Sequence, residues 1–154
     1  MNHTIKTLLV RILDLENFFE SFYRNLALSQ EAQKDYALKN TAAILSLEEK
    51  RHGEVCQELI NKDVGAKHLI SDDILSQVEY FLITLKQSAN SYGILTAKQL
   101  IAHAIDSENR QITLLNRILE LLRKDNIDSS LEEVFVYLLE EESKHVNNLQ
   151  VFLK

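Results

Sequence analysis

The chain has 154 residues, of which 45% are hydrophobic and 26% are charged. This balance excludes a disordered chain and predicts a single globular domain over residues 1–154 with a core of its own. The formal net charge is −6, and no basic cluster is long enough to follow a phosphate backbone, so we expect no nucleic-acid partner. The chain has no proline and three glycines, which favours long helices over a turn-rich β fold.

Cysteine usage and the distribution of apolar residues narrow the class further. The single cysteine, Cys56, excludes both an intrachain disulfide and a Cys-x-x-Cys metal motif. No apolar run approaches the ~20 residues that a membrane span requires. The first residues, "MNHTIKTLLVRIL", lack a signal-peptide pattern because Arg11 interrupts the apolar run and no small-residue cleavage site follows. We therefore expect a cytoplasmic protein without a membrane partner.

Apolar periodicity predicts four long helices. The first covers roughly residues 4–27, and the second follows a cap at Ser29 and continues to about residue 61. The third starts at Thr96, where Gln99 completes a capping box, and ends near residue 124. The fourth starts at Ser129, where Glu132 completes another capping box, and continues almost to the end.

The lengths of the connections predict how these helices are arranged. Short links make the first and second helices antiparallel neighbours, and likewise the third and fourth. The long connection over residues 62–95 allows a crossover between the two pairs and contains a short extra helix of its own, capped by Ser71. The predicted fold is therefore an all-α four-helix bundle with one crossover.

Each predicted helix carries an acidic residue within its apolar stripe. The first and third stripes contain one glutamate each, and the second and fourth contain a glutamate followed three residues later by a histidine. These residues are Glu16, Glu49, His52, Glu108, Glu142 and His145. Carboxylates that meet in a core repel one another, so they require either protonation or bound cations.

Bound metal is the compensation that the sequence favours, because lysines and arginines lie mainly off these stripes. Four carboxylates and two neutral imidazoles form a mixed oxygen and nitrogen set, which suits iron or manganese, with zinc also possible. A glutamate and a histidine at i and i+3 lie on adjacent turns and can reach one ion. One glutamate from each of two helices, with Glu-x-x-His from each of the other two, is the ligand set of dinuclear carboxylate bundles.

The spacing of these motifs is more specific than either motif alone, because chance supplies a single Glu-x-x-H easily. "LEEKRH" (47–52) resembles "EEESKH" (140–145), and each core glutamate of these motifs follows another stripe glutamate by 33 residues (16 to 49) or 34 residues (108 to 142). The repeated register predicts that the six residues form one site.

Other polar residues allow more than one interpretation. Glu48 and Glu141 are expected to face solvent, or alternatively to orient a ligand histidine. Tyr23 either packs with its hydroxyl bonded, or hydrogen-bonds a ligand carboxylate or supplies an electron. Cys56 is expected to be a small buried hydrophobe. The remaining histidines are expected at the surface: His3, His68 and His103.

The motifs "ENFFESFY", "EEKRH", "AIDSEN" and "EEESKH" resemble the ferritin-like superfamily, most closely the rubrerythrin family, and the resemblance covers nearly the whole chain. It implies a di-iron site that reacts with hydrogen peroxide or dioxygen, and a homodimer. It also implies the ligands Glu16, Glu49, His52, Glu108, Glu142 and His145, with Glu49 and Glu142 as bridges between two irons. Tyr23 matches a tyrosine near the family's metal site.

The chain departs from this family at several positions. A second helix-three glutamate, associated with redox-dependent ligand switching, is replaced by Gln111, so that the ligand set looks like that of bacterioferritin. Because the chain lacks Cys-x-x-Cys motifs, we expect no rubredoxin centre, and electrons must come from a separate donor protein or from Fe(II) itself. Met1 is the only methionine, so we also expect no haem of the bacterioferritin type.

Four functions follow from these observations. The first is a di-iron oxidoreductase of rubrerythrin type that reduces hydrogen peroxide or dioxygen. The second is a ferroxidase and iron-storage protein of bacterioferritin type, which Gln111 and the missing rubredoxin motif favour. The third is a ferritin-like di-iron hydroxylase, which requires an open cleft beside the metals. The fourth is a metal-free helical interaction module.

Overall fold

The structure is a computed structural model that describes residues 3–91 and 93–153. These residues form six helices: α1 (Ile5–Ala27), α2 (Gln30–Lys34), α3 (Tyr36–Asn61), α4 (Asp72–Ser88), α5 (Ala97–Lys124) and α6 (Ser129–Val151). Two short strands, β1 (His3–Thr4) and β2 (Leu69–Ile70), pair antiparallel, with His3 opposite Ile70. The predicted all-α class is confirmed.

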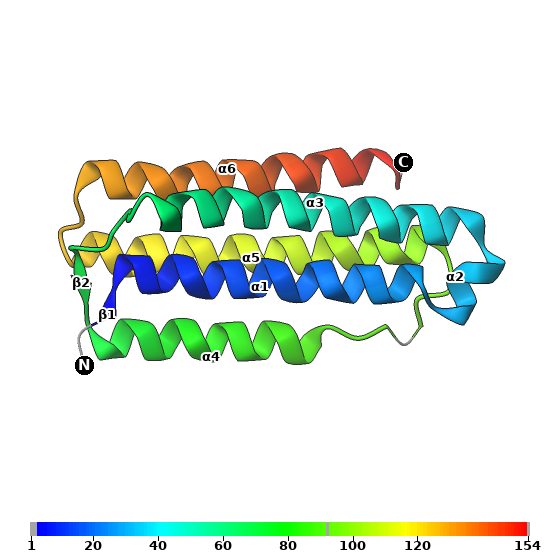
Figure 1. The fold of residues 1–154 in the computed structure, drawn as a ribbon, viewed down its shortest axis with the longest axis horizontal. Coiled ribbons are helices and arrows are strands. Elements are labelled where there is room, and N and C mark those ends of the chain that lie inside the picture. The colour runs from blue at the N-terminus through cyan, green and yellow to red at the C-terminus, as the bar shows by residue number, and fades with distance from the viewer. Residues whose placement is uncertain (1–2, 92, 154) are drawn as a thin grey trace.

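Helices α1, α3, α5 and α6 lie side by side along the long axis of the molecule (Figure 1). The most extensive helix contacts join α1 to α3 and α5 to α6, which are the two pairs that the short connections predict. Helix α4, within the crossover, lies outside these four and packs against α1 and α5. The β1–β2 pair closes one end of the bundle, and α2 lies at the other (Figure 1).

The ends of two helices differ from the sequence prediction. The helix expected after Ser29 is interrupted at Asp35, whose extended backbone (φ −134°, ψ 102°) separates α2 from α3. The Asp35 carboxylate accepts a hydrogen bond from the backbone N–H of Leu38 at 3.1 Å, which makes Asp35 the N-cap of α3. At α6 the N-cap is Asp128 instead of Ser129. The Glu132 carboxylate is 2.7 Å from Arg123 Nη2 and forms no capping box.

The crossover helix α4 begins as predicted, because the Ser71 hydroxyl oxygen accepts a hydrogen bond from the backbone N–H of Ile74 at 3.2 Å. Its apolar side covers α1 and α5. The turn before it depends on Gly65, which has φ +74° and whose carbonyl oxygen accepts a hydrogen bond from the Lys6 N–H at 3.3 Å. A Cβ atom at Gly65 would lie 2.6 Å from Ile5 Cγ2, so that only glycine fits this contact.

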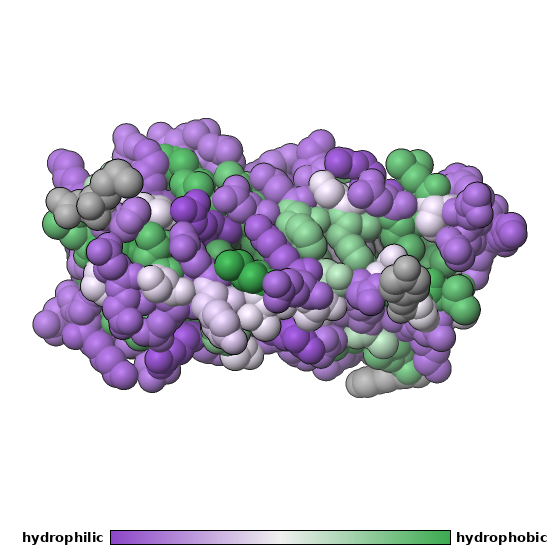
Figure 2. All heavy atoms as spheres, turned by 90° about the horizontal axis from the view of Figure 1, so that it is seen from below, coloured by the Kyte–Doolittle hydropathy of each residue, from purple (hydrophilic) through white to green (hydrophobic). Residues whose placement is uncertain are grey.

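The core between the helices is closely filled with apolar side chains, the largest of which are Tyr23, Phe19 and Phe135. The face on the α4 side is mainly hydrophilic, with hydrophobic side chains in separate patches (Figure 2). Across the described parts of the chain, no helix has both the length and the apolar character needed to cross a bilayer.

Candidate metal centre

The four bundle helices bring all six predicted ligand residues to one place in the core. Each of these side chains is at most 7% exposed, and Glu108 is fully buried. Helix α1 supplies Glu16 and α5 supplies Glu108, while α3 and α6 each supply a glutamate and a histidine: Glu49 and His52, Glu142 and His145. The i, i+3 spacing on α3 and α6 points each histidine in the same direction as its glutamate.

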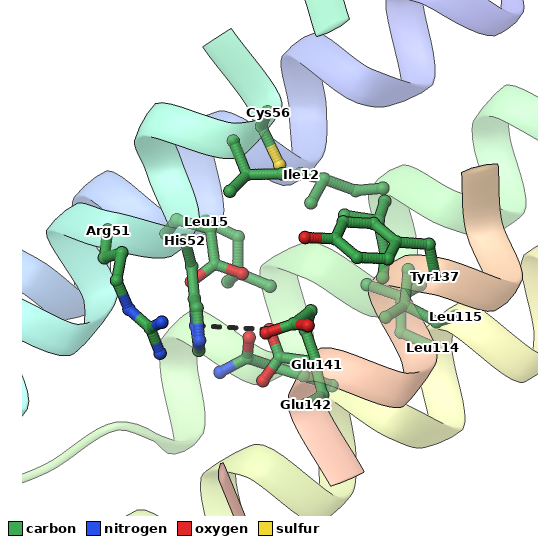
Figure 3. A pocket seen from close by; sticks show the side chains of 14 residues that line it. Ile12, Leu15, Arg51, His52, Cys56, Leu114, Leu115, Tyr137, Glu141 and Glu142 are labelled. Carbon is green, nitrogen blue, oxygen red and sulfur yellow. Dashed lines mark ion pairs between the residues drawn. The ribbon is translucent and has the colours of Figure 1, made fainter. Parts of the chain in front are cut away.

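The imidazoles lie within short distances of carboxylates from other helices. His52 Nδ1 is 3.5 Å from Glu142 Oε1 and 3.8 Å from Glu16 Oε2. His145 Nδ1 is 3.4 Å from Glu108 Oε1. Figure 3 shows the His52–Glu142 contact as a dashed line between α3 and α6. The centroids of the two imidazole rings are 5.3 Å apart, with the planes at 81° to each other.

Three sets of these residues have ligand atoms that lie within 4.8 Å of one another and can hold a metal ion. The sets are Glu16, His52 and Glu142; Glu108, Glu142 and His145; and Glu49, His52 and His145. Glu142 belongs to one set with each histidine, and Glu49 belongs to a set that contains both. This is the arrangement expected if the two carboxylates bridge a pair of ions.

The ligand atoms themselves have few partners within the chain. Among residues 3–91 and 93–153, both oxygens of Glu49 and of Glu108 and the Nδ1 atoms of His52 and His145 lack a hydrogen-bond partner outside the cluster. The glutamates can bond one another only while they hold protons. Buried polar groups of folded proteins are almost always hydrogen-bonded, because each unsatisfied group costs about 1–3 kcal/mol. A concentration of unsatisfied carboxylate and imidazole atoms at one point therefore fits residues that coordinate metal ions.

The pKa values of the ligand residues in the protein without metal also fit a metal site. Burial, followed by repulsion from Glu49, raises the pKa of Glu16 from 4.5 to about 8. Burial also raises the pKa values of the other three glutamates well above 4.5. Burial and the neighbouring His52 lower the pKa of His145 from 6.5 to about 4, so its imidazole is neutral at pH 7. Without cations the site is stable only when these carboxyl groups hold protons.

Tyr23 lies on α1, two turns beyond Glu16 toward the α2 end, and is 1% exposed. Burial and the carboxylates of Glu49 and Glu108 raise the pKa of its phenol well above 10. A hydrogen bond with the Ser107 side chain acts in the opposite direction, although no described residue meets strict hydrogen-bond geometry with the hydroxyl oxygen. The phenol therefore keeps its proton beside the acidic cluster, and its two predicted roles, packing with a bonded hydroxyl or bonding a ligand carboxylate, both stay predictions.

The other residues singled out from the sequence mostly match the predictions. Cys56 is buried, as predicted, and Glu48 and Glu141 form ion pairs with Arg51 and Lys144 instead of orienting a histidine. An exception is His103, which was expected at the surface. Its ring is partly buried and stacks on Phe22 at a centroid distance of 5.3 Å, and this burial lowers its pKa.

Gln111 is the buried polar residue of this region whose position periodicity did not predict. It is 3% exposed and lies one turn after Glu108 on α5, whereas the next residue, Ile112, is partly exposed. Its Nε2 donates no hydrogen bond to any described residue. Helical spacing alone cannot decide whether the residue three or four positions after Glu108 is buried, so periodicity did not predict the burial of Gln111.

Comparisons with known proteins add no relative: no family model matches the chain, and no curated protein or solved structure matches it significantly.

Proposed function

We propose that this chain is a ferritin-like di-iron carboxylate protein of rubrerythrin type, which reduces hydrogen peroxide or dioxygen. The observation that carries the proposal is the buried set of four carboxylates and two imidazoles whose ligand atoms lack partners among the described residues. A metal-free interaction module would leave these groups unsatisfied in the core without any gain, which the free-energy cost of such groups disfavours.

The charges of the set fit two divalent ions. Four ionised glutamates carry four negative charges and two neutral imidazoles add none, so that two divalent cations make the centre neutral. The mixture of carboxylate oxygen and imidazole nitrogen suits iron or manganese, and zinc is also compatible. Glu49 and Glu142 are the residues that we expect to bridge, since Glu142 belongs to one set with each histidine and Glu49 belongs to the set that contains both.

The side chains of the centre have separate roles in this proposal. The six ligands bind the ions, and the apolar residues around them exclude bulk water. A bound ferrous pair would supply the two electrons that, with two protons, convert one hydrogen peroxide molecule into two water molecules. Tyr23 keeps its proton at Oη and can donate a hydrogen bond to a ligand carboxylate.

Anaerobic reconstitution with Fe(II) tests the proposal. We expect elemental analysis to find about two iron ions per chain, and we expect one equivalent of peroxide to oxidise both, as followed by absorbance. Glu49→Gln should lose at least one ion and most of the oxidation. Glu48→Gln, at the neighbouring position that pairs with Arg51 at the surface, is the matched control and should behave as wild type. Stoichiometric zinc in the purified protein together with no iron oxidation would refute the proposal.

Gln111 favours a second candidate, a ferroxidase of bacterioferritin type, because an amide stands where rubrerythrins carry an additional acid. Both candidates oxidise Fe(II), so the two are separated by the oxidant and by the size of the assembly. Faster oxidation by peroxide in a protein of dimer size supports the first. Faster oxidation by dioxygen in a large closed shell that retains many iron ions per chain supports the second.

A further inference from the structure

A cavity of about 70 Å³ lies directly beside the candidate metal centre. It is displaced by one helical turn from the ligands toward the β1–β2 end of the bundle. Ile12 lies four residues before Glu16, and Leu138 lies four residues before Glu142, on helices that run away from that end. In Figure 3 the side chains of Ile12, Cys56 and Tyr137 lie together on one side of the His52–Glu142 pair. Tyr23 is on the opposite side of the centre.

The walls of the cavity are mainly apolar and come from all four bundle helices. The apolar residues that line it are Ile12, Leu15, Val55, Cys56, Leu114, Leu115 and Leu138. Gln111 is the buried amide in this wall, and its Nε2 is without a hydrogen-bond partner in the described chain. A buried donor at the edge of an apolar cavity is satisfied when a bound molecule places an acceptor next to it.

The size of the cavity exceeds what the proposed oxidants need. At roughly 10–15 Å³ for each water-sized sphere, 70 Å³ corresponds to about five atoms of that size. Hydrogen peroxide and dioxygen each contain two such atoms. The remaining space, and its apolar character, fit a small organic molecule instead of water.

The surrounding charges favour an uncharged molecule. The innermost wall is formed by Glu16, His52 and Glu142, which belong to a centre that two divalent ions would make neutral. At the rim, Arg51 is already paired with Glu48 at 2.8 Å, and Glu141 with Lys144 at 3.5 Å. An anion or a cation would therefore be desolvated here without a free charge to receive it.

We propose that this cavity binds a small, uncharged, mainly apolar organic molecule of about five non-hydrogen atoms, with one acceptor atom facing the Gln111 amide. This inference rests on the proposed metal centre, because the bound ions make the inner wall neutral. In this proposal an organic molecule binds beside the metal centre in addition to the oxidant. The cavity lies between the four bundle helices, and no described residue of the crossover lines it.

Binding of 2-butanone to the zinc-loaded protein tests this inference by NMR, because zinc is diamagnetic. Butanone has five non-hydrogen atoms and one carbonyl acceptor. We expect it to shift the side-chain amide signals of Gln111 in a saturable manner and to leave Gln57 unchanged, since Gln57 Nε2 bonds Asn61 at the surface. The isostere 2-methyl-1-butene, which has a CH₂ group in place of the oxygen, should bind about three- to tenfold more weakly, the factor that one neutral hydrogen bond supplies. Butyrate, an anion, should not bind.

Two variants separate the cavity from general effects on folding. Gln111→Leu should remove the preference for butanone over 2-methyl-1-butene while still binding the isostere, which a merely unfolded variant could not do. Val55→Phe should fill the cavity and abolish binding of both probes while retaining zinc. The inference is overturned if the wild type holds zinc but shows no saturable butanone shift, or if Gln111→Leu keeps the preference for butanone. Neither result would contradict the proposed metal centre. If no metal is taken up, the proposed function fails, and the same titration of metal-free protein then decides whether the cavity binds the probe by itself.

Discussion

Replacing Glu16 by glutamine should make the metal-free protein less sensitive to rising pH. The pKa of Glu16 is raised in the folded protein, so this group stabilises the fold fully below its unfolded pKa of 4.5 and loses that contribution as the pH approaches 8. Glu49, Glu108 and Glu142 act in the same direction, because their pKa values are raised too. Glutamine keeps the shape of the protonated acid and does not ionise.

The magnitude follows from the pKa of Glu16. A change from 4.5 to about 8 corresponds to about 5 kcal/mol at about 1.4 kcal/mol per pKa unit, which is comparable to the whole stability of an ordinary domain. Between pH 6.5 and 8 roughly 1–2 kcal/mol of this is lost. His145 acts oppositely, since its lowered pKa of about 4 makes stability rise with pH, but that rise is nearly complete by pH 6.5.

Urea denaturation of the chelator-treated protein at several pH values from 6.5 to 8 measures this effect. We expect the free energy of unfolding of the wild type to fall over this range, and that of Glu16→Gln to fall by roughly 1–2 kcal/mol less. Glu20→Gln is the control, because Glu20 lies one turn further along α1 and pairs with Arg24. A wild-type stability that is constant or rises over this range, or a Glu16→Gln variant with the same slope, would refute the electrostatic argument.

Three further predictions concern single residues. Tyr23→Phe should keep the metal content and lower metal-free stability by about 1 kcal/mol or less, the value of one neutral hydrogen bond. Peroxide consumption should fall, and an unchanged rate would show that Tyr23 serves only in packing. Gly65→Ala should lower the urea midpoint by the equivalent of about 1–3 kcal/mol, because φ is +74° and Ile5 occupies the space for Cβ. Asp35→Ala should cost about 1 kcal/mol through the lost cap of α3, and an unchanged midpoint would contradict that role.

The positions of the candidate ligands could be predicted because their register follows from helix geometry alone. A glutamate and a histidine three residues apart share a helix face whatever the neighbouring helices do, and the apolar residues around them identify that face as the core. The break at Asp35 could not be predicted in the same way. Apolar periodicity continues across it, and an aspartate can either remain within a helix or cap a new one. His103 was misplaced because its burial depends on Phe22, which lies on a different helix.

The burial of Gln111 also depends on neighbouring helices and could not be predicted from helix periodicity. On α5, positions 111 and 112 lie on either side of the line through Glu108, and only the packing of the neighbouring helices decides which one is buried. The structure buries the amide and leaves Ile112 partly exposed. A residue that the sequence suggests as a missing carboxylate thus becomes a hydrogen-bond donor in the wall of a cavity. In the proposed centre Gln111 adds no carboxylate ligand, and in the proposed cavity its amide offers a hydrogen bond to a bound molecule.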